Sequence, residues 1–487
     1  MTTQKKLMTN WRWWLCSLLF VATTVNYLDR QVLSLTYEEF IKPEFHWTDA
    51  HYGTITSFFS IFYAIACLFA GKFVDWMGTK KGYLIAIGVW SAGACMHAAC
   101  GWATSLITGQ DVIALRGVEV ASNVTLAIST TSVYLFLLCR GILALGEAGN
   151  FPAAIKVTAE YFPKKDRAFA TSIFNAGASV GALAAPLAIP PLASALGWEW
   201  AFIIIGALGF VWMFFWQFMY DKPENSKHVN AAELEYIHQD DAAEAAEKAA
   251  AAEAAKSEPS ISLAKSFTYR QTWAFIVGKF FTDGVWWFFL FWAPSYFSNQ
   301  FNAPATSFLG QALIFTLYAI VTVVSIGGGY LPKIFVEKKG MDPYAGRMRA
   351  MLIFAFFPLC ALLAQPLGVH FNSPWWPAVL IGLAAAGHQA WSANLFSTIG
   401  DMFPKSTIAT ITGIGAMAGG VGSMIIQKVA GNLFTFAETQ GAAFSFLGFE
   451  GKPAGYFIVF CFCGIAYLLA WCIMKALVPV YKPINKL

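Results

Sequence analysis

The feature that most constrains this chain is a series of long apolar runs, each about as long as a bilayer is thick. A helix needs about 20 mostly apolar residues to cross the hydrocarbon core of a membrane. Runs of this kind begin near residues 13, 52, 83, 132, 168, 200, 272, 308, 348, 375, 408 and 454. Only 12% of the 487 residues are charged, about half the share in soluble domains. The sequence therefore predicts an all-α integral membrane protein with twelve transmembrane helices.

The longest polar segment separates the first six runs from the last six. Residues 221–270 include Ala, Glu and Lys runs around 242–256, a composition that favours a solvated helix. We therefore predict two six-helix bundles, residues 1–220 and 271–487, joined by a cytoplasmic linker over 221–270. Glycines spaced for close helix packing occur in both halves, at Gly177 and Gly181 and again at Gly415, Gly419, Gly420 and Gly422.

Basic residues are concentrated in alternate loops, and this bias predicts the orientation, because short cytoplasmic loops carry an excess of Lys and Arg. One set of loops and the C-terminal tail hold most of them: Lys72, Lys80, Lys81, Lys164, Lys165, Arg167, Lys333, Lys338, Lys339, Arg347, Arg349, Lys475, Lys482 and Lys486. The other loops hold chiefly Lys42, Arg116 and Lys452. We expect both termini to be cytoplasmic and the weakly polar insert at 103–131 to lie outside.

Several functional classes are disfavoured by what the sequence lacks. The nine cysteines lie in apolar runs without a CxxC pair or a Cys/His cluster, and no GxxxxGK[ST] loop is present. We expect no metal, no cofactor and no nucleic-acid partner, and the missing nucleotide-binding loop argues against a primary ATP-driven pump. A membrane enzyme is the broader alternative to a carrier, although no nucleophile–base pair stands out among the acids and His388.

Ionisable residues inside the first and fourth runs are the strongest functional signal, because charge at membrane depth is costly. The first run ends in a sequence that contains Asn26, Asp29 and Arg30. The fourth holds Arg140 and Glu147, which are seven residues, or about two helical turns, apart and share one face. A cation beside a titratable acid can bind an anion and a proton in turn. The alternative is a fixed ion pair that only holds helices together.

The second half carries two further polar groups. Lys279 and Asp283 are one turn apart, so they form either a structural or gating pair or part of a substrate contact. The tenth run contains polar side chains beside an indole, which suit a polyol or sugar-like ligand, although a packed hydrogen-bonding His is an equal alternative. Those residues are His388, Gln389, Trp391 and Asn394, and further pocket candidates are Trp286, Trp287, Tyr63 and Asn175.

Several motifs resemble those of a known family. The segment Gly71–Lys81 resembles the loop signature of the major facilitator superfamily, with Asp75 between two glycines and the basic pair Lys80 and Lys81 at its end. The corresponding loop of the second half, 329–349, keeps only a degenerate echo. Within the superfamily the chain resembles the anion:cation symporter family, and bacterial hexuronate transporters in particular, through residues 26–30, 140–147, 278–283 and 388–394. The insert at 103–131 is absent from the better-known members.

The resemblance implies a proton-coupled symporter that imports a sugar acid, in the first place a hexuronate, by alternating access. Arg30 would contact the substrate carboxylate, Asp29 and Glu147 would take up protons, and Arg140 would modulate Glu147. The remaining substrate-binding candidates are Tyr63, Asn175, Lys279, Trp286, Trp287, His388, Gln389, Trp391 and Asn394, and the gating candidates are Asp75, Lys80, Lys81, Arg167 and Asp283. A carrier of galactonate or another carboxylate, by symport, uniport or exchange, is the alternative. We expect a monomer in the lipid bilayer of a bacterial inner membrane.

Overall fold

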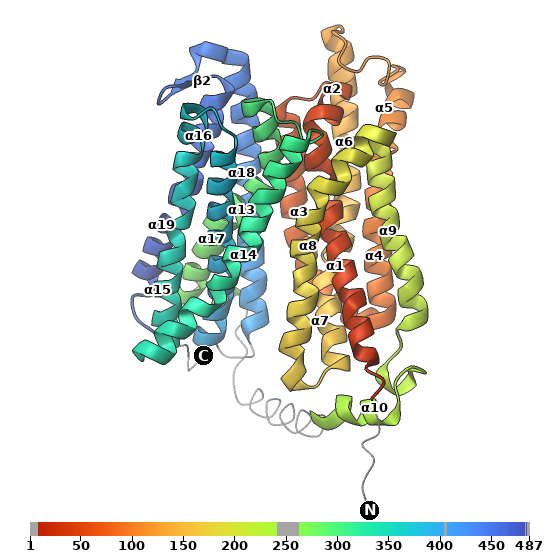
Figure 1. Cartoon of the computed structure of the whole chain (residues 1–487), viewed down its shortest axis with the longest axis vertical. Helices are drawn as coiled ribbons and strands as arrows, with labels where there is room; N and C mark the ends of the chain where they lie inside the picture. Colours follow the sequence, from red (N-terminus) through yellow and green to blue (C-terminus); the bar gives the residue numbers. More distant parts are fainter. Residues whose placement is uncertain (1–7, 241–262, 404–406, 483, 485–487) are drawn as a thin grey trace, which may run out of the picture.

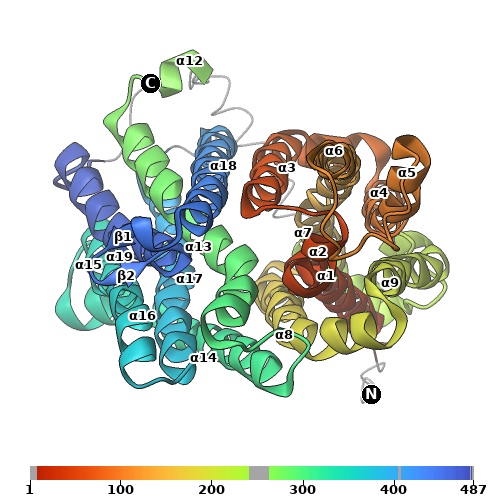
Figure 2. The same cartoon turned by 90° about the horizontal axis from the view of Figure 1, so that it is seen from above.

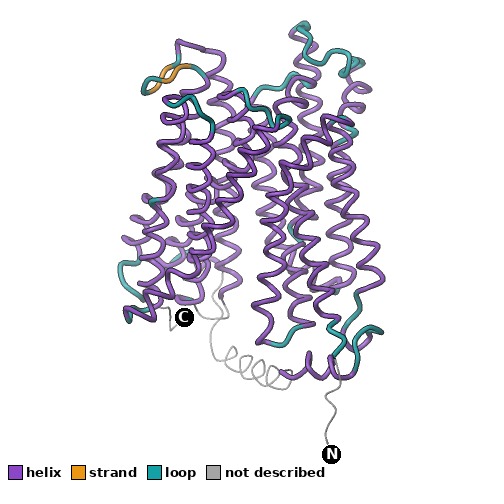
Figure 3. Tube along the Cα trace, in the orientation of Figure 1, coloured by secondary structure: helices purple, strands orange, loops and turns teal. Residues whose placement is uncertain are grey.

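The chain folds into two helical bundles that lie side by side (Figure 1). The structure is a computed structural model and describes residues 8–240, 263–403, 407–482 and 484. The predicted solvated run at 242–256 lies outside the described residues. Short strands occur only in one hairpin within the described ranges, β1 (Ser445–Phe446) and β2 (Phe449–Glu450), which pair antiparallel (Figure 3).

The first bundle contains α1 (Trp11–Thr36), the π-helical turn η1 (Tyr37–Ile41), α2 (Lys42–Glu44), α3 (Asp49–Met77), α4 (Thr79–His97), α5 (Cys100–Thr108), α6 (Ser122–Glu147), α7 (Asn150–Tyr161), α8 (Lys164–Leu196) and α9 (Trp198–Met219). Short helices follow it: η2 (Pro223–Asn225), α10 (Ala231–Ile237), η3 (His238–Asp240) and α12 (Leu263–Ser266). The second bundle contains α13 (Arg270–Phe301), α14 (Phe308–Lys339), α15 (Pro343–Ala355), η4 (Phe357–Leu359), α16 (Cys360–His370), α17 (Trp375–Met402), α18 (Ile408–Gln440), η6 (Gly441–Ala443) and α19 (Lys452–Leu477).

Each of the twelve predicted runs lies on a long helical segment. In the described part of the chain, nine segments are long and apolar enough to cross a membrane, or ten if α4 and α5, which meet at a bend of 53°, form one span. The other two long helices are α1 and α17. Polar residues interrupt their apolar runs: Asn26, Asp29 and Arg30 in α1, and His388, Gln389 and Asn394 in α17. The two long helices that are less apolar than the others, α1 and α17, therefore both carry predicted site residues.

Glycines set how closely helices approach in both bundles, as their spacing predicts. A Cβ atom at Gly181 on α8 would lie 2.6 Å from the carbonyl oxygen of Thr24 on α1, so only glycine admits this contact. In the second bundle, a Cβ atom at Gly422 on α18 would lie 1.9 Å from the carbonyl oxygen of Phe280 on α13. The helices that carry the site residues are thus held backbone to backbone.

The two bundles meet chiefly along two helix pairs, α3 with α18 and α8 with α14 (Figure 2), and α1 also contacts α13. We call the end where α1 begins and α19 ends the terminal end, and the other the opposite end (Figure 1). Hydrogen bonds between α3 and α18 lie on the part of α3 nearer the opposite end. They join the Ala50 amide to Thr435 Oγ1 (2.8 Å), Ser57 Oγ to the Met424 carbonyl (2.9 Å), and the hydroxyls of Ser423 and Ser60 (2.9 Å).

The first part of the linker is docked on the terminal end of the first bundle. Glu233 on α10 is fully buried and accepts hydrogen bonds from the amides of Trp11 (3.0 Å) and Arg12 (3.1 Å) and from Arg12 Nη1 (3.0 Å). A carboxylate at a helix N-terminus satisfies amides that have no partner within the helix. α10 therefore caps α1, while the division of the chain at residues 220 and 271 stays a prediction.

Candidate functional site

A buried ion pair between two helices of the first bundle forms the centre of the candidate site. The Nε and Nη2 atoms of Arg30 on α1 donate to Glu147 Oε2 on α6, at 3.0 and 2.7 Å. The two side chains are only 4% and 0% exposed. A charge at this depth is stable only when it is paired, because water cannot solvate it. The sequence predicts both residues as site residues but does not specify that they contact each other.

Aromatic rings surround the Arg30 guanidinium. Its central carbon lies 5.1 Å from the ring centroid of Tyr27, 4.9 Å from that of Tyr63 and 5.0 Å from that of Trp287, all within cation–π distance. Trp287 belongs to α13 of the second bundle, whereas the two tyrosines belong to the first. Arg30 therefore lies at the interface of the two bundles, where a ligand can contact both.

Unpaired polar atoms are gathered next to this ion pair. The Nε and Nη1 atoms of Arg140 and the Oε1 atom of Glu147 are buried without a hydrogen-bond partner among the described residues. Asp29 is buried beside them, next to the indole of Trp90. Arg140 interacts electrostatically with Glu147 and Asp29, so the three predicted charges of this bundle do lie in one cluster with Arg30. Buried polar groups are nearly always hydrogen-bonded in native proteins. The cluster therefore has unused capacity to bind an anion and protons.

A second group of predicted residues comes together inside the second bundle. Lys279 Nζ lies 2.6 Å from Asp283 Oδ2 and 4.5 Å from the ring centroid of Phe396. His388 Nδ1 is hydrogen-bonded to the Tyr467 hydroxyl at 2.7 Å. The His388 ring also stacks on Trp286, with centroids 5.5 Å apart. His388 is thus a packed, hydrogen-bonded residue. Its stacking partner Trp286 directly precedes Trp287, the tryptophan that contacts Arg30.

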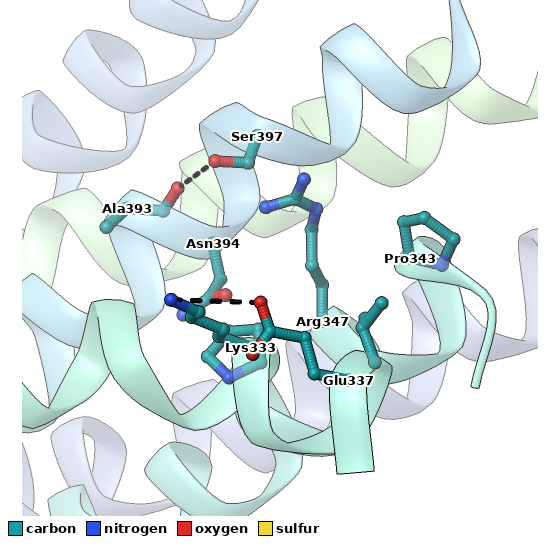
Figure 4. A pocket seen from close by; sticks show the side chains of 9 residues that line it. Lys333, Glu337, Pro343, Arg347, Ala393, Asn394 and Ser397 are labelled. Atoms are coloured by element: carbon teal, nitrogen blue, oxygen red, sulfur yellow. Dashed lines mark hydrogen bonds and ion pairs between the residues drawn. The ribbon is translucent and has the colours of Figure 1, made fainter. Parts of the chain in front are cut away.

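The remaining substrate candidates lie apart from Arg30. Asn394 donates to the Ala390 carbonyl at 2.8 Å and lines a cavity of about 360 Å³ together with Lys333 and Arg347 (Figure 4). The residues that line this cavity all belong to α14, α15 and α17 of the second bundle. Trp391 is fully buried against Tyr467, with ring centroids 5.5 Å apart. Gln389 is half-buried on α17, and Asn175 is exposed on α8.

The predicted gating residues of the signature loop have partners within the first bundle. Asp75 pairs with Lys156 on α7 at 2.8 Å, and Lys80 pairs with Asp221 after α9 at 2.9 Å. Arg167 donates to the carbonyls of Phe162 (2.8 Å) and Ala159 (3.0 Å). Lys81 is exposed at the start of α4. Asp283 does not lie beside these residues but pairs with Lys279 in the second bundle, and the gating role of the whole set stays a prediction.

Polar contacts that the sequence analysis missed join the bundles at the opposite end. The hydroxyls of Ser295 and Ser298 on α13 donate to the carboxylates of Glu38 (2.6 Å) and Glu39 (2.9 Å) on η1. Lys452 on α19 pairs with Asp49 on α3 at 2.7 Å. Burial, with the neighbouring charge of Glu38 adding to it, raises the pKa of Glu39 to about 7. The only sequence signal is a pair of adjacent glutamates directly after the first run, and it does not identify their partners.

Comparison with known proteins gives three results. The Major Facilitator Superfamily profile matches residues 19–426. The hexuronate transporter of Escherichia coli (strain K12) is 26% identical over 460 residues, which cover 91% of this chain and 95% of that protein. The probable galactarate/D-glucarate transporter GarP of the same strain is 26% identical over 450 residues, which cover 91% and 93%.

Solved structures show the same architecture. A bacterial homologue of the human lysosomal transporter Spinster, in an inward-facing and occupied conformation, superposes with a TM-score of 0.66 at 17% identity and covers 96% of this chain and 97% of its own. The family match spans most of both bundles, including the helices that hold Arg30, Glu147 and Trp287. The protein is therefore a multi-pass membrane transporter rather than a membrane enzyme, and it belongs to the major facilitator superfamily.

Proposed function

We propose that this transporter imports a sugar acid, in the first place a hexuronate, together with protons. The relatives whose names specify hexuronate or galactarate and D-glucarate support a sugar acid, since they align over nearly the whole chain. The basic-loop bias supports an orientation with cytoplasmic termini in a bacterial inner membrane. The terminal end is then the cytoplasmic end, and the opposite end faces outside.

The observation that carries this proposal is the Arg30–Glu147 ion pair at the interface of the bundles. The guanidinium fork is the side chain best matched to a carboxylate, and here a carboxylate of the protein occupies it. A substrate carboxylate can replace Glu147 only if Glu147 loses its own charge, because an unpaired buried carboxylate is strongly disfavoured. Protonation of Glu147 removes that charge, so substrate binding and proton binding depend on each other.

The neighbouring charges complete the cycle. Asp29 is buried and interacts electrostatically with Glu147 and Arg140, so it is the second group that takes up a proton before substrate binds. Arg140 stabilises the deprotonated acids once the substrate has left, since it interacts with both Asp29 and Glu147. The hydrogen bonds between α3 and α18 near the opposite end support a carrier that is closed towards the outside. Rocking of the two bundles around the site between them would then open this site to each side of the membrane in turn.

The direct test compares wild-type protein with Glu147→Gln in proteoliposomes. Glutamine imitates the protonated acid and leaves Arg30 available, so we expect substrate binding and exchange to persist at all pH values while a proton gradient no longer drives accumulation. Glu119→Gln, a substitution in the exposed insert, is the matched control and should behave as wild type. Accumulation of glucuronate by Glu147→Gln against its gradient would refute the coupling role. Uptake by wild type that is indifferent to the proton gradient would favour a uniporter or exchanger.

A further inference from the structure

The second bundle contains a buried ion pair for which the transport cycle above has no role. Lys279 and Asp283 on α13 are 2.6 Å apart, with side chains 7% and 15% exposed. Their composition repeats that of the Arg30–Glu147 pair: one cation is held by one carboxylate inside the membrane-spanning part of a bundle. A purely structural pair at this depth stabilises a protein little, because desolvation offsets most of the attraction.

The position of this pair relative to Arg30 follows from the spacing of residues on α13. Lys279, Asp283 and Trp287 are four residues apart in turn, so they lie on one face of the helix. The Trp287 ring contacts the Arg30 guanidinium at 5.0 Å. The ion pair brings Lys279 Nζ to the level of Asp283, about one helical turn or ~6 Å along the axis from Trp287. The two cations are therefore on the order of 10 Å apart along one track.

Both ion pairs leave one carboxylate oxygen unpaired. Asp283 Oδ1 and Glu147 Oε1 are buried and accept no hydrogen bond from any described residue. The hydrogen bonds from Arg30 to Glu147 use the Nε and Nη2 atoms, which is fewer than the five donor hydrogens that a guanidinium carries. Each cation is thus held by one oxygen of a carboxylate that a stronger or better oriented anion can replace.

The separation of the two cations suits a particular length of substrate. The terminal carboxylate carbons of an extended six-carbon chain are roughly 6 Å apart, because each bond of ~1.5 Å advances the chain by slightly more than 1 Å. A charge-assisted hydrogen bond of about 2.8 Å at each end brings the span between two cations to roughly 12 Å. A monocarboxylate of the same length reaches the second cation only with a neutral hydroxyl or carbonyl group.

On this basis, and resting on the proposed function, we propose that Lys279 and Asp283 form a second anion subsite, so that the carrier accepts six-carbon sugar acids with a carboxylate at each end. One carboxylate replaces Glu147 on Arg30, and the other replaces Asp283 on Lys279. Asp283 then takes a proton for the same reason as Glu147. A dianionic aldarate therefore moves with one proton more than a monoanionic hexuronate, and the two substrates transfer the same net charge.

The experiment uses full-length protein in proteoliposomes and four probes: galactarate, glucarate, galacturonate and glucuronate. The variant is the double substitution Lys279→Met with Asp283→Asn, which removes both charges and leaves neither one buried alone. We expect it to weaken aldarate uptake at least tenfold and to change hexuronate uptake less than threefold. The matched control removes one positive and one negative charge at two exposed positions of the second bundle, Lys338→Met with Glu450→Gln, and should alter neither.

A second measurement does not depend on any variant. Proton uptake per substrate, measured on wild type under an imposed membrane potential, should be larger by one for galactarate than for galacturonate. Equal proton counts, an equal loss of both substrate classes in the double variant, or failure of wild type to bind aldarates would each overturn the second subsite. Hexuronate transport that continues in those cases leaves the proposed function intact, whereas absence of all sugar-acid transport refutes the proposed function itself.

Discussion

At the scale of single residues, Arg30 is distinguished by the combination of its partners. Three aromatic rings from two bundles lie within about 5 Å of its guanidinium, and its charge is met by a carboxylate that is 117 residues away in the sequence. The rings lie within cation–π distance of the guanidinium, and its Nε and Nη2 atoms donate to Glu147. The planar shape of the Arg30 guanidinium as well as its charge therefore determines how it binds a carboxylate.

Replacing Arg30 by Lys tests this geometry. Lysine keeps the positive charge but presents a point charge without the planar fork, so it cannot bind a carboxylate through two parallel bonds. We expect the apparent KM for the sugar acid to rise at least tenfold, which corresponds to about 1.4 kcal/mol. Uptake kinetics measure the effect, and Arg270→Lys, at the exposed start of α13, is the control. An unchanged KM would show that Arg30 does not bind the carboxylate.

At the scale of elements, α1 is the helix whose position decides the site, and two other elements hold it. The glycines of α8 let the two helix backbones touch along the middle of α1. α10 fixes the terminal end of α1 through the buried side chain of Glu233. Asp29 and Arg30 therefore depend on contacts made far from them in the sequence, and two substitutions separate the contributions.

Gly181→Ala tests the contact between α1 and α8. The added Cβ would lie 2.6 Å from the Thr24 carbonyl and 2.8 Å from Tyr27 Cβ, so the helices must separate and Tyr27 must leave the Arg30 guanidinium. We expect a lower melting temperature in detergent and at least a tenfold loss of transport. Gly71→Ala on α3, where a Cβ meets nothing within 4 Å, should keep wild-type stability. Equal behaviour of both variants would contradict the role of this contact.

Glu233→Gln tests the cap on α1. The substitution removes the charge that pairs with buried Arg12 at 3.0 Å, and loss of one partner of a buried pair typically costs about 3–5 kcal/mol. We expect a melting temperature several degrees lower, measured by intrinsic fluorescence in detergent. Glu235→Gln, on the exposed side of the same helix, provides the control and should melt as wild type does. A variant as stable as the control would mean that α10 does not anchor α1.

At the scale of the whole molecule, the bundles are joined at the opposite end by a network that contains an acid with an altered pKa. Glu39 accepts a hydrogen bond from Ser298, and its backbone carbonyl accepts one from Arg116 at 3.2 Å. Glu38, the other acid of η1, pairs with Lys42 at 2.9 Å. Burial raises the pKa of Glu39 from 4.5 to about 7 while this end is closed.

This shift predicts that acid favours closure of the opposite end. When the bundles separate there, water reaches Glu39 and its pKa returns towards 4.5, so the closed arrangement binds the proton more tightly. The stabilisation of the closed arrangement is fully present below about pH 4.5 and is lost as the pH rises through about 7. Spin labels introduced as noncanonical amino acids at Glu119 and Leu447, one in each bundle, report the distance across this end.

The expected result is a shift from short to long distances between pH 5 and pH 8 in wild type. Glu39→Gln should stay closed and lose this pH dependence, because glutamine keeps the hydrogen bond with Ser298 but does not ionise. Glu450→Gln, on the exposed hairpin, is the control and should follow wild type. A distance that is independent of pH in wild type would contradict the prediction.

Much of the fold could be predicted because its causes are local in the sequence. A run of about 20 apolar residues determines a span wherever it packs, and Gly177 and Gly181 mark a close contact without naming the partner helix. The charged residues Asp29, Arg30, Arg140 and Glu147 could be selected as site residues because each is costly inside a span. The polarity of Asn394 and Gln389 predicts a site role for the same kind of reason, but these two residues do not lie beside Arg30. A helix has several faces, and polarity alone does not show which face meets the other bundle.

The sequence by itself therefore determined that the chain is a helical protein that spans a membrane many times, and it marked the charged residues inside the spans as candidates for the site. Only the tertiary structure decided which charges meet. Arg140 and Glu147 share a helix, yet Glu147 pairs with Arg30, because α1 and α6 approach at that level and seven residues of helix hold the first two about 10 Å apart. The same packing brings Trp287 of the second bundle onto Arg30 and Ser298 onto Glu39. Contacts between distant segments depend on how whole helices pack, and no local pattern encodes that packing.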